Sequence, residues 1–236
     1  MKLHESLVLK NLSDFILDRR LPNRGHEGMY MVWKTIEYFD PKSILEIGFF
    51  AGQTLGLMIE AASPEAKFTS VDNSYRYRSI FENIFPDNSV QFIEVDSRHL
   101  KLNQKFDFIM IDGDHHYDLV VNDLKICLPL LHANSILCMD DYYYFDGVAQ
   151  AIQEYLLGQH NFVPFFCGLQ QMFFHHVTHS AEDFLDNYVM SQSVSDIVEF
   201  TNINYHGFTV LKGQIFSRAL VEDTDIFRAT LKFYDI

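Results

Sequence analysis

Short apolar runs alternate with amphipathic stretches along the chain from residue 28 to residue 160. The apolar runs contain little polar alternation, which is typical of strands buried on both faces. The expected strands are SILEIGF (43–49), KFTSVDNS (67–74), VQFIEVDS (90–97), FDFIMIDGD (106–114) and SILCMDDYY (135–143). The segments between them have helical spacing. The pattern therefore predicts a parallel sheet with helices on both faces.

The C-terminal third has a different pattern. The segments 162–177 and 203–218 favour strands, and the acidic stretch 181–200 between them favours a helix. Together with the alternating core, they predict an α/β protein with a doubly wound, mostly parallel, seven-stranded sheet.

The N-terminal segment predicts an amphipathic helix that ends before Pro22. The apolar residues near one face of this helix are Leu7, Leu9, Leu12, Phe15 and Ile16. A second helix is expected over 29–39.

No internal repeat or low-complexity linker divides the chain, so we expect a single domain in three parts. These parts are an N-terminal helical cap (1–27), a ligand-binding core (28–160), and the last strands with an extension (161–236).

Composition and charge limit the classes of molecule that this protein is expected to bind. The 236 residues include 18 Lys and Arg against 32 Asp and Glu, so the formal net charge is −14 and a nucleic-acid backbone would on average be repelled. No apolar run reaches the ~18 residues that span a bilayer. Three cysteines without metal-type spacing, Cys127, Cys138 and Cys167, are expected to be buried free thiols in a reducing compartment. We therefore expect a cytoplasmic protein that binds neither nucleic acid nor membrane.

The stretch ILEIGFFAGQT (44–54) is similar to the opening of a dinucleotide-binding fold, but its glycines differ. The dinucleotide fingerprint is G-x-G-x-x-G, whereas this loop has only Gly48 and Gly52, with Phe50 in the place of the second glycine. Glu46 precedes the first glycine and would repel a pyrophosphate. The loop therefore favours a ligand without a phosphate at this position.

Acidic residues occur at the ends of all five expected strands. They fall in Glu46 to Gly52, Asp72 with Asn73, Asp96 with Ser97, Asp112 to His116, and Asp140 with Asp141. In an open parallel sheet, ligands bind beyond the carboxyl ends of the strands, where the strand order reverses. Helix capping is the structural alternative for Asp72 and Asp96. Five acids in succession favour one ligand site along this edge.

S-adenosylmethionine gives each of these positions a task. Glu46 would order the first loop and meet the ammonium group, Asp72 would accept hydrogen bonds from both ribose hydroxyls, and Asp96 would accept one from the adenine amine. The small residues of the first loop would let the backbone approach the methionine part. The expected cofactor-binding residues are Glu46, Gly48, Phe49, Gly52, Thr54, Asp72, Asn73, Asp96, Ser97, Asp112 and Gly113.

These motifs in order resemble the class I S-adenosylmethionine-dependent methyltransferases. The motifs are ILEIGFFAGQT, VDNS, EVDS, FIMIDGDHHYDLVVNDL and DDYYYFDGV, and they cover about residues 28–160. Within this class, the IDGDHxY pattern resembles small-molecule O-methyltransferases of the macrocin and cephamycin-biosynthesis type. The resemblance implies a Rossmann-like methyltransferase fold and a small-molecule hydroxyl acceptor.

The resemblance also implies a metal site and a base. Related catechol-type and cephamycin-type enzymes hold magnesium at positions that match Asp112, Asp140 and Asp141, and three carboxylates suit a hard divalent cation such as Mg²⁺. Asp114 is a substitute ligand. His115 matches the position of a catalytic lysine in catechol-type enzymes, so it is the candidate base, with Asp112 as its catalytic neighbour. His116 reads as an ordinary surface histidine.

Two other functions stay open at this stage. A nicotinamide-dependent oxidoreductase would use the same architecture, but the glycine spacing argues against it. A non-catalytic binding or scaffold protein derived from a methyltransferase would keep the acids only as helix caps. The acceptor molecule, the choice between O- and N-methylation and the oligomeric state are not readable, although the N-terminal helices and the aromatic C-terminal strands could join copies into a homo-oligomer.

Overall fold

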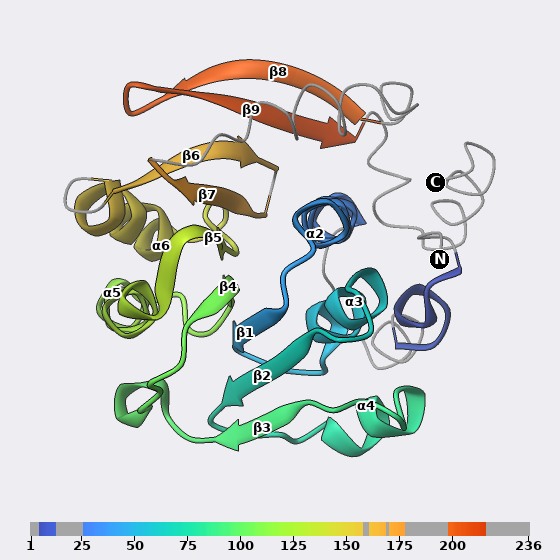
Figure 1. Cartoon of the computed structure of the whole chain (residues 1–236). Coiled ribbons are helices and arrows are strands. Elements are labelled where there is room, and N and C mark those ends of the chain that lie inside the picture. The colour runs from blue at the N-terminus through green and yellow to red at the C-terminus, as the bar shows by residue number, and fades with distance from the viewer. Residues whose placement is uncertain (1–4, 13–25, 158–160, 169, 178–197, 216–236) are drawn as a thin grey trace.

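The computed structural model describes residues 5–12, 26–157, 161–168, 170–177 and 198–215. Within these residues, nine strands form one sheet in the order β3-β2-β1-β4-β5-β7-β6-β9-β8 (Figure 1). The parallel part contains β1 (Ser43–Ile47), β2 (Lys67–Asp72), β3 (Gln91–Glu94), β4 (Phe106–Ile111) and β5 (Leu131–Met139). Strand order reverses between β1 and β4, which confirms the doubly wound prediction and defines the switch point.

Helices cover both faces of the sheet (Figure 1). One face carries α2 (His26–Phe39), α3 (Gln53–Ala61) and α4 (Arg78–Ile84). The other carries α5 (Tyr117–Cys127), α6 (Asp146–Ala151) and the π-helix η5 (Ile152–Leu157). Short 3₁₀ turns, η3 (Ser97–His99) and η4 (Leu128–Leu130), follow β3 and α5.

The alternation of side chains along each central strand explains the two layers. Ile44 and Phe108 face the α2/α3 side, whereas Leu45 and Ile109 face the α5/α6 side. Successive strand residues point to opposite faces, so a strand with apolar residues on both faces must be covered on both sides.

The C-terminal strands extend the sheet beyond β5. They are β6 (Phe162–Cys167), β7 (Met172–His176), β8 (Val198–Tyr205) and β9 (Phe208–Ile215). β7 pairs antiparallel with β5, and the β8–β9 hairpin joins through β6 at the pairs Phe166↔Leu211 and Cys167↔Lys212. The predicted number of strands and one predicted helix need correction.

The described sheet has nine strands instead of seven, because each of the expected strand segments 162–177 and 203–218 contributes to two strands.

The second correction concerns the expected helix 181–200. Residues 198–200 begin β8, because their backbone pairs with the end of β9. The rest of this expected helix, 181–197, lies outside the described residues.

The N-terminal segment contains a π-helix, η2 (Val8–Leu12), that packs against α3 and α4. Val8 and Leu9 are buried, and Leu7 is 39% exposed instead of sharing their apolar face. Glu60 of α3 accepts hydrogen bonds from the Ser6 hydroxyl and from the backbone N–H of Leu7. These bonds hold the backbone of residue 7 at the surface and turn its side chain outward. The predicted positions Phe15 and Ile16 lie outside the described residues.

The three cysteines are buried and free, as the sequence predicts. Cys127 lies on α5, Cys138 on β5 and Cys167 on β6. No helix in the described part of the chain is long and apolar enough to cross a membrane.

Candidate functional site

A cavity of about 560 Å³ lies beyond the carboxyl ends of β1 to β4, at the switch point. Seven of the predicted cofactor-binding residues line it: Gly48, Asp72, Asn73, Asp96, Ser97, Asp112 and Gly113. Its lining also includes the apolar side chains of Val71, Val95 and Leu119. A chamber with acids around apolar walls at this edge suits a polar ligand with a flat apolar portion.

The loop after β1 is ordered by Asp72 at the end of β2. One oxygen of its carboxylate accepts hydrogen bonds from the backbone N–H groups of Phe49 (2.6 Å) and Phe50 (3.2 Å). The other oxygen accepts from the backbone N–H of Ser74 at 2.9 Å. Asp72 therefore fixes the loop that borders the cavity, while its ribose contact stays a prediction.

Four of the predicted cofactor residues, Glu46, Phe49, Gly52 and Thr54, are absent from the cavity lining. Glu46 is 1% exposed and accepts a hydrogen bond from the Ser70 hydroxyl at 3.1 Å. The Phe49 ring packs edge-on against Phe81 and Phe92. Glu46 and Phe49 therefore pack beneath the cavity instead of lining it.

Phe50 takes the opposite orientation to its neighbour in the sequence. It has φ 46 and a side chain that is 45% exposed, lines the cavity and packs edge-on against Tyr77. The sequence does not tell which of the two rings is buried, because a loop has no regular periodicity.

The acids near η3 differ in their surroundings. Asp96 caps η3 through the backbone N–H of Arg98 and forms a two-oxygen ion pair with the Arg98 guanidinium, which holds the pKa of Asp96 well below its usual range. Asp123 on α5 is 2% exposed and lines the same cavity. Burial raises the pKa of Asp123, and a hydrogen bond with Ser97 opposes that shift. The sequence did not indicate Asp123, because an acidic residue in a helical segment usually lies on the solvent-exposed face.

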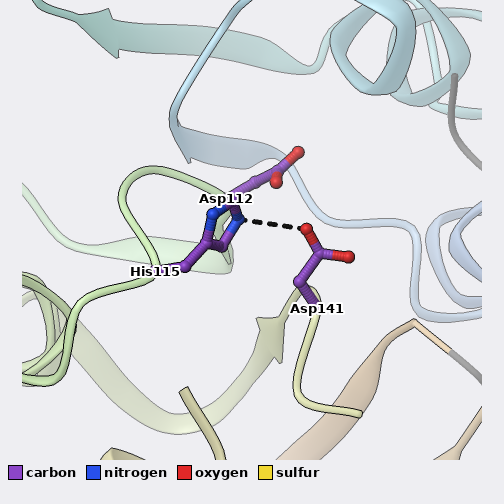
Figure 2. A group of neighbouring side chains, drawn as sticks. All are labelled: Asp112, His115 and Asp141. Atoms are coloured by element: carbon purple, nitrogen blue, oxygen red, sulfur yellow. Dashed lines mark ion pairs between the residues drawn. The ribbon is translucent and has the colours of Figure 1, made fainter. Parts of the chain in front are cut away.

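A second cluster lies where β4 and β5 end (Figure 2). Asp112 and His115 come from the loop after β4, and Asp141 follows β5; one ligand atom from each lies within 4.8 Å of the others. Nε2 of His115 is 3.0 Å from a carboxylate oxygen of Asp141, which raises the pKa of His115. This nitrogen is buried and has no hydrogen-bond partner in the described structure, so the contact is an ion pair only when the imidazole is protonated.

The remaining predicted acids point elsewhere. Asp140 is 5% exposed, its carboxylate accepts a hydrogen bond from the Gln171 amide at 2.5 Å, and it is not one of the three grouped residues, although its charge contributes to raising the pKa of His115. Asp114 pairs with Nδ1 of His116 at 2.6 Å, and the His116 side chain is 87% exposed. The structure thus brings Asp112 and Asp141 of the predicted metal set together with the predicted base.

Aromatic side chains after β5 border this cluster. The Phe145 ring stacks face to face on His115, with 4.0 Å between centroids and 6° between planes. Tyr143 and Tyr144 are exposed, whereas Tyr142 is buried and donates a hydrogen bond to the carbonyl of Gly168 at 2.8 Å. Tyr142 therefore packs between elements, whereas the rings of Tyr143, Tyr144 and Phe145 are exposed.

Comparisons with known proteins agree with this geometry. Residues 45–142 match a family described as a methyltransferase domain. A search of curated proteins found no match.

Solved structures of low sequence identity share the fold. An SAH-bound methyltransferase of Podospora anserina has a TM-score of 0.61 at 19% identity, covering 72% of this chain and 87% of that one. An O-methyltransferase of Bacillus cereus in complex with SAH has a TM-score of 0.56 at 15% identity, with coverages of 71% and 88%. An O-methyltransferase of Streptomyces achromogenes, involved in tomaymycin synthesis and in complex with SAM, has a TM-score of 0.56 at 15% identity, with coverages of 72% and 89%.

Proposed function

We propose that this chain is a class I S-adenosylmethionine-dependent methyltransferase, which the match of residues 45–142 to a methyltransferase domain family and the shared fold support. The proposed reaction is methyl transfer from S-adenosylmethionine to a hydroxyl group of a small molecule. The observation that carries the proposal is the placement of the Asp112–His115–Asp141 cluster beside a cavity of about 560 Å³ at the switch point. Asp112 belongs to both, so a cofactor in the cavity would direct its reactive end toward the cluster.

The cavity lining supports the choice of cofactor. The Asp72 carboxylate reaches both the first loop and the cavity, where it would accept hydrogen bonds from the ribose hydroxyls. Gly48 brings backbone to the cavity wall, and the loop lacks the glycine spacing that a pyrophosphate requires. The cavity is therefore better suited to S-adenosylmethionine than to a dinucleotide.

The donor set of the cluster fits a divalent cation. The carboxylates of Asp112 and Asp141 offer oxygen atoms within 4.8 Å of each other, and the imidazole of His115 lies beside them. We propose Asp112 and Asp141 as the ligands, with Asp114 and Asp140 committed to other partners. A bound Mg²⁺ would lower the pKa of the acceptor hydroxyl.

His115 has one lone pair at Nε2, and that lone pair serves either a cation or a proton. We assign it to the proton: Nε2 takes the hydrogen of the acceptor hydroxyl, the oxygen bonds to the methyl carbon, and the carbon–sulfur bond breaks. The sulfonium thereby becomes the neutral thioether of S-adenosylhomocysteine. Phe145 and Asp141 hold the imidazole from its face and its edge. The protein orients the in-line displacement and accepts the proton.

Calorimetric titration tests the cofactor assignment. We expect S-adenosylhomocysteine to bind with one site per chain and NADH not to bind, because the first loop has no pyrophosphate-binding glycines. Asp72→Ala should weaken binding by at least about tenfold, which corresponds to ~1.4 kcal/mol. Binding of NADH without S-adenosylhomocysteine would overturn the proposal, and binding without turnover on any hydroxyl acceptor would favour a scaffold.

Metal removal tests the cation. We expect EDTA to lower methyl transfer at least about tenfold and added Mg²⁺ or Mn²⁺ to restore it, since the cation would lower the pKa of the acceptor. Asp141→Ala should reproduce the loss, and no added cation should repair it. Asp118→Ala is the matched control, because it removes the same charge from an exposed site on α5. Full activity in EDTA would remove the cation from the mechanism.

A further inference from the structure

One of the acids that line the cofactor cavity is buried, and its task differs from that of its exposed neighbour. Asp123 on α5 is 2% exposed, whereas the Asp96 side chain after β3 is 35% exposed. Both residues, and Ser97 between them, line the same cavity. Asp96 and Asp123 are therefore alternative acceptors for a hydrogen-bond donor of a ligand in this cavity.

Asp96 has little acceptor capacity left. Its Oδ1 accepts from the backbone N–H and from Nε of Arg98, at 3.0 and 2.9 Å. Its Oδ2 faces Nε at 3.1 Å and also Nη2 of the same guanidinium. The one hydrogen on Nε is shared between the two oxygens, so Arg98 directs three N–H donors at a carboxylate that offers about four lone-pair positions, and little acceptor capacity remains on Asp96.

Asp123 is placed differently. Its carboxylate has hydrogen bonds with the Ser97 hydroxyl and, at 3.4 Å, with the Asn122 amide. Oδ2 lies beside the backbone of Gly113, only 3.2 Å from where a Cβ would stand. Gly113 belongs to the loop after β4, so the buried oxygen reaches the cavity wall between the ends of β3 and β4.

Burial makes this carboxylate a strong acceptor for a ligand donor. Removal from water penalises the charged form of Asp123, and this raises its pKa. A hydrogen bond from a bound ligand would relieve that penalty. Leu119 and Val95 line the cavity with it and offer apolar surface to a flat ring. A planar base with an exocyclic amine has the shape and the donor for this wall.

We propose that Asp123 selects the adenine base of the cofactor by accepting a hydrogen bond from its exocyclic amine, with Asp96 held in the Arg98 pair. This assignment rests on the proposed function. The sequence predicts that Asp96, after β3, recognises the adenine base. The structure instead favours the buried Asp123 on α5 for this task. A carboxylate only accepts, so the carbonyl of a deaminated base would meet it with like partial charge.

The test compares S-adenosylhomocysteine with S-inosylhomocysteine, in which a carbonyl oxygen replaces the adenine amine. Calorimetry on the full chain at pH 7.5 should give a wild-type preference for S-adenosylhomocysteine of about tenfold or more. Asp123→Asn keeps the volume, and its amide can pair with either base. Its preference should therefore fall to within about threefold, mainly through tighter binding of the inosine compound.

Asp96→Asn is the matched control and should keep the wild-type preference. A wild-type preference that survives Asp123→Asn, or that is lost in Asp96→Asn, would overturn the assignment. Asp123→Leu should weaken S-adenosylhomocysteine binding, and thermal unfolding shows whether the variant is folded. Wild-type protein that binds neither compound would instead contradict the proposed function.

Discussion

Replacing His115 with alanine is expected to lower kcat by about 10²- to 10⁴-fold, the usual contribution of a positioned general base. Nε2 of His115 faces Asp141 within the cluster that borders the proposed cofactor cavity, so its loss would remove the proposed proton acceptor. The side chain itself is absent from the residues that line that cavity. Affinity for S-adenosylhomocysteine should therefore stay within about twofold of wild type.

The neighbouring residue supplies the control for His115. His116→Ala should keep kcat within about twofold, because the side chain is 87% exposed and pairs only with Asp114 among the described contacts. The Mg²⁺ concentration that gives half-maximal rate should be unchanged in His115→Ala. A strong rise in that concentration with kcat restored at saturating Mg²⁺ would show that His115 is a metal ligand and not the base.

Replacing Gly48 with alanine is expected to destabilise the fold by about 3 kcal/mol or more, because two penalties add. Gly48 has φ +97, where a side chain is strained. A Cβ would also lie 1.9 Å from the backbone carbonyl oxygen of Asp112, and backbone at the end of a central strand has no room to move. Urea unfolding followed by circular dichroism measures this loss as a lower midpoint with an unchanged slope.

Gly207 separates the two penalties. It has φ +90 at the tip of the β8–β9 hairpin, and a Cβ there would meet nothing within 4 Å. Gly207→Ala should therefore cost only the conformational strain, on the order of 1 kcal/mol. Equal losses in the two variants would contradict the close approach between the first loop and the end of β4.

The same contact changes the interpretation of the first loop. The sequence attributes Gly48 and Gly52 to the approach of backbone to the cofactor. Gly48 does line the cavity, but its missing Cβ is required by the carbonyl of Asp112. At Gly52, which has φ +76, a Cβ would meet the rings of Phe81 and Phe49. A glycine in the sequence can indicate that another group lies close to its backbone, but only the tertiary structure shows which group that is.

The parallel core could be predicted because its signal is local. Doubly buried strands such as β1 and β4 are mainly apolar on both faces, with Ser43, Glu46 and Asp107 as the polar exceptions, and the helices between them have their own period. The position of the site follows from this pattern, since parallel strands bring their carboxyl ends to one edge. That is why Asp72, Asp96 and Asp112 meet in one cavity.

The use of each acid could not be predicted in the same way. Asp72 holds a loop, Asp96 pairs with Arg98 and Asp140 binds Gln171, although all of them end strands. The partners of Asp72 and Asp140 lie in segments far away in the sequence, and the partner of Asp96 lies two residues after it. A strand-end rule gives the place of a carboxylate and not the direction of its oxygens.

The amino-acid sequence by itself determined the fold class, the order of the core elements and the edge that carries the site, because these depend on hydrophobic periodicity and on residues at strand ends. Tertiary structure alone decided which side chains share a chamber. It turned Phe49 inward and Phe50 outward, brought Asp141 to His115, and buried Asp123 in the cavity wall. These outcomes depend on packing between segments far apart in the chain, which no local pattern encodes.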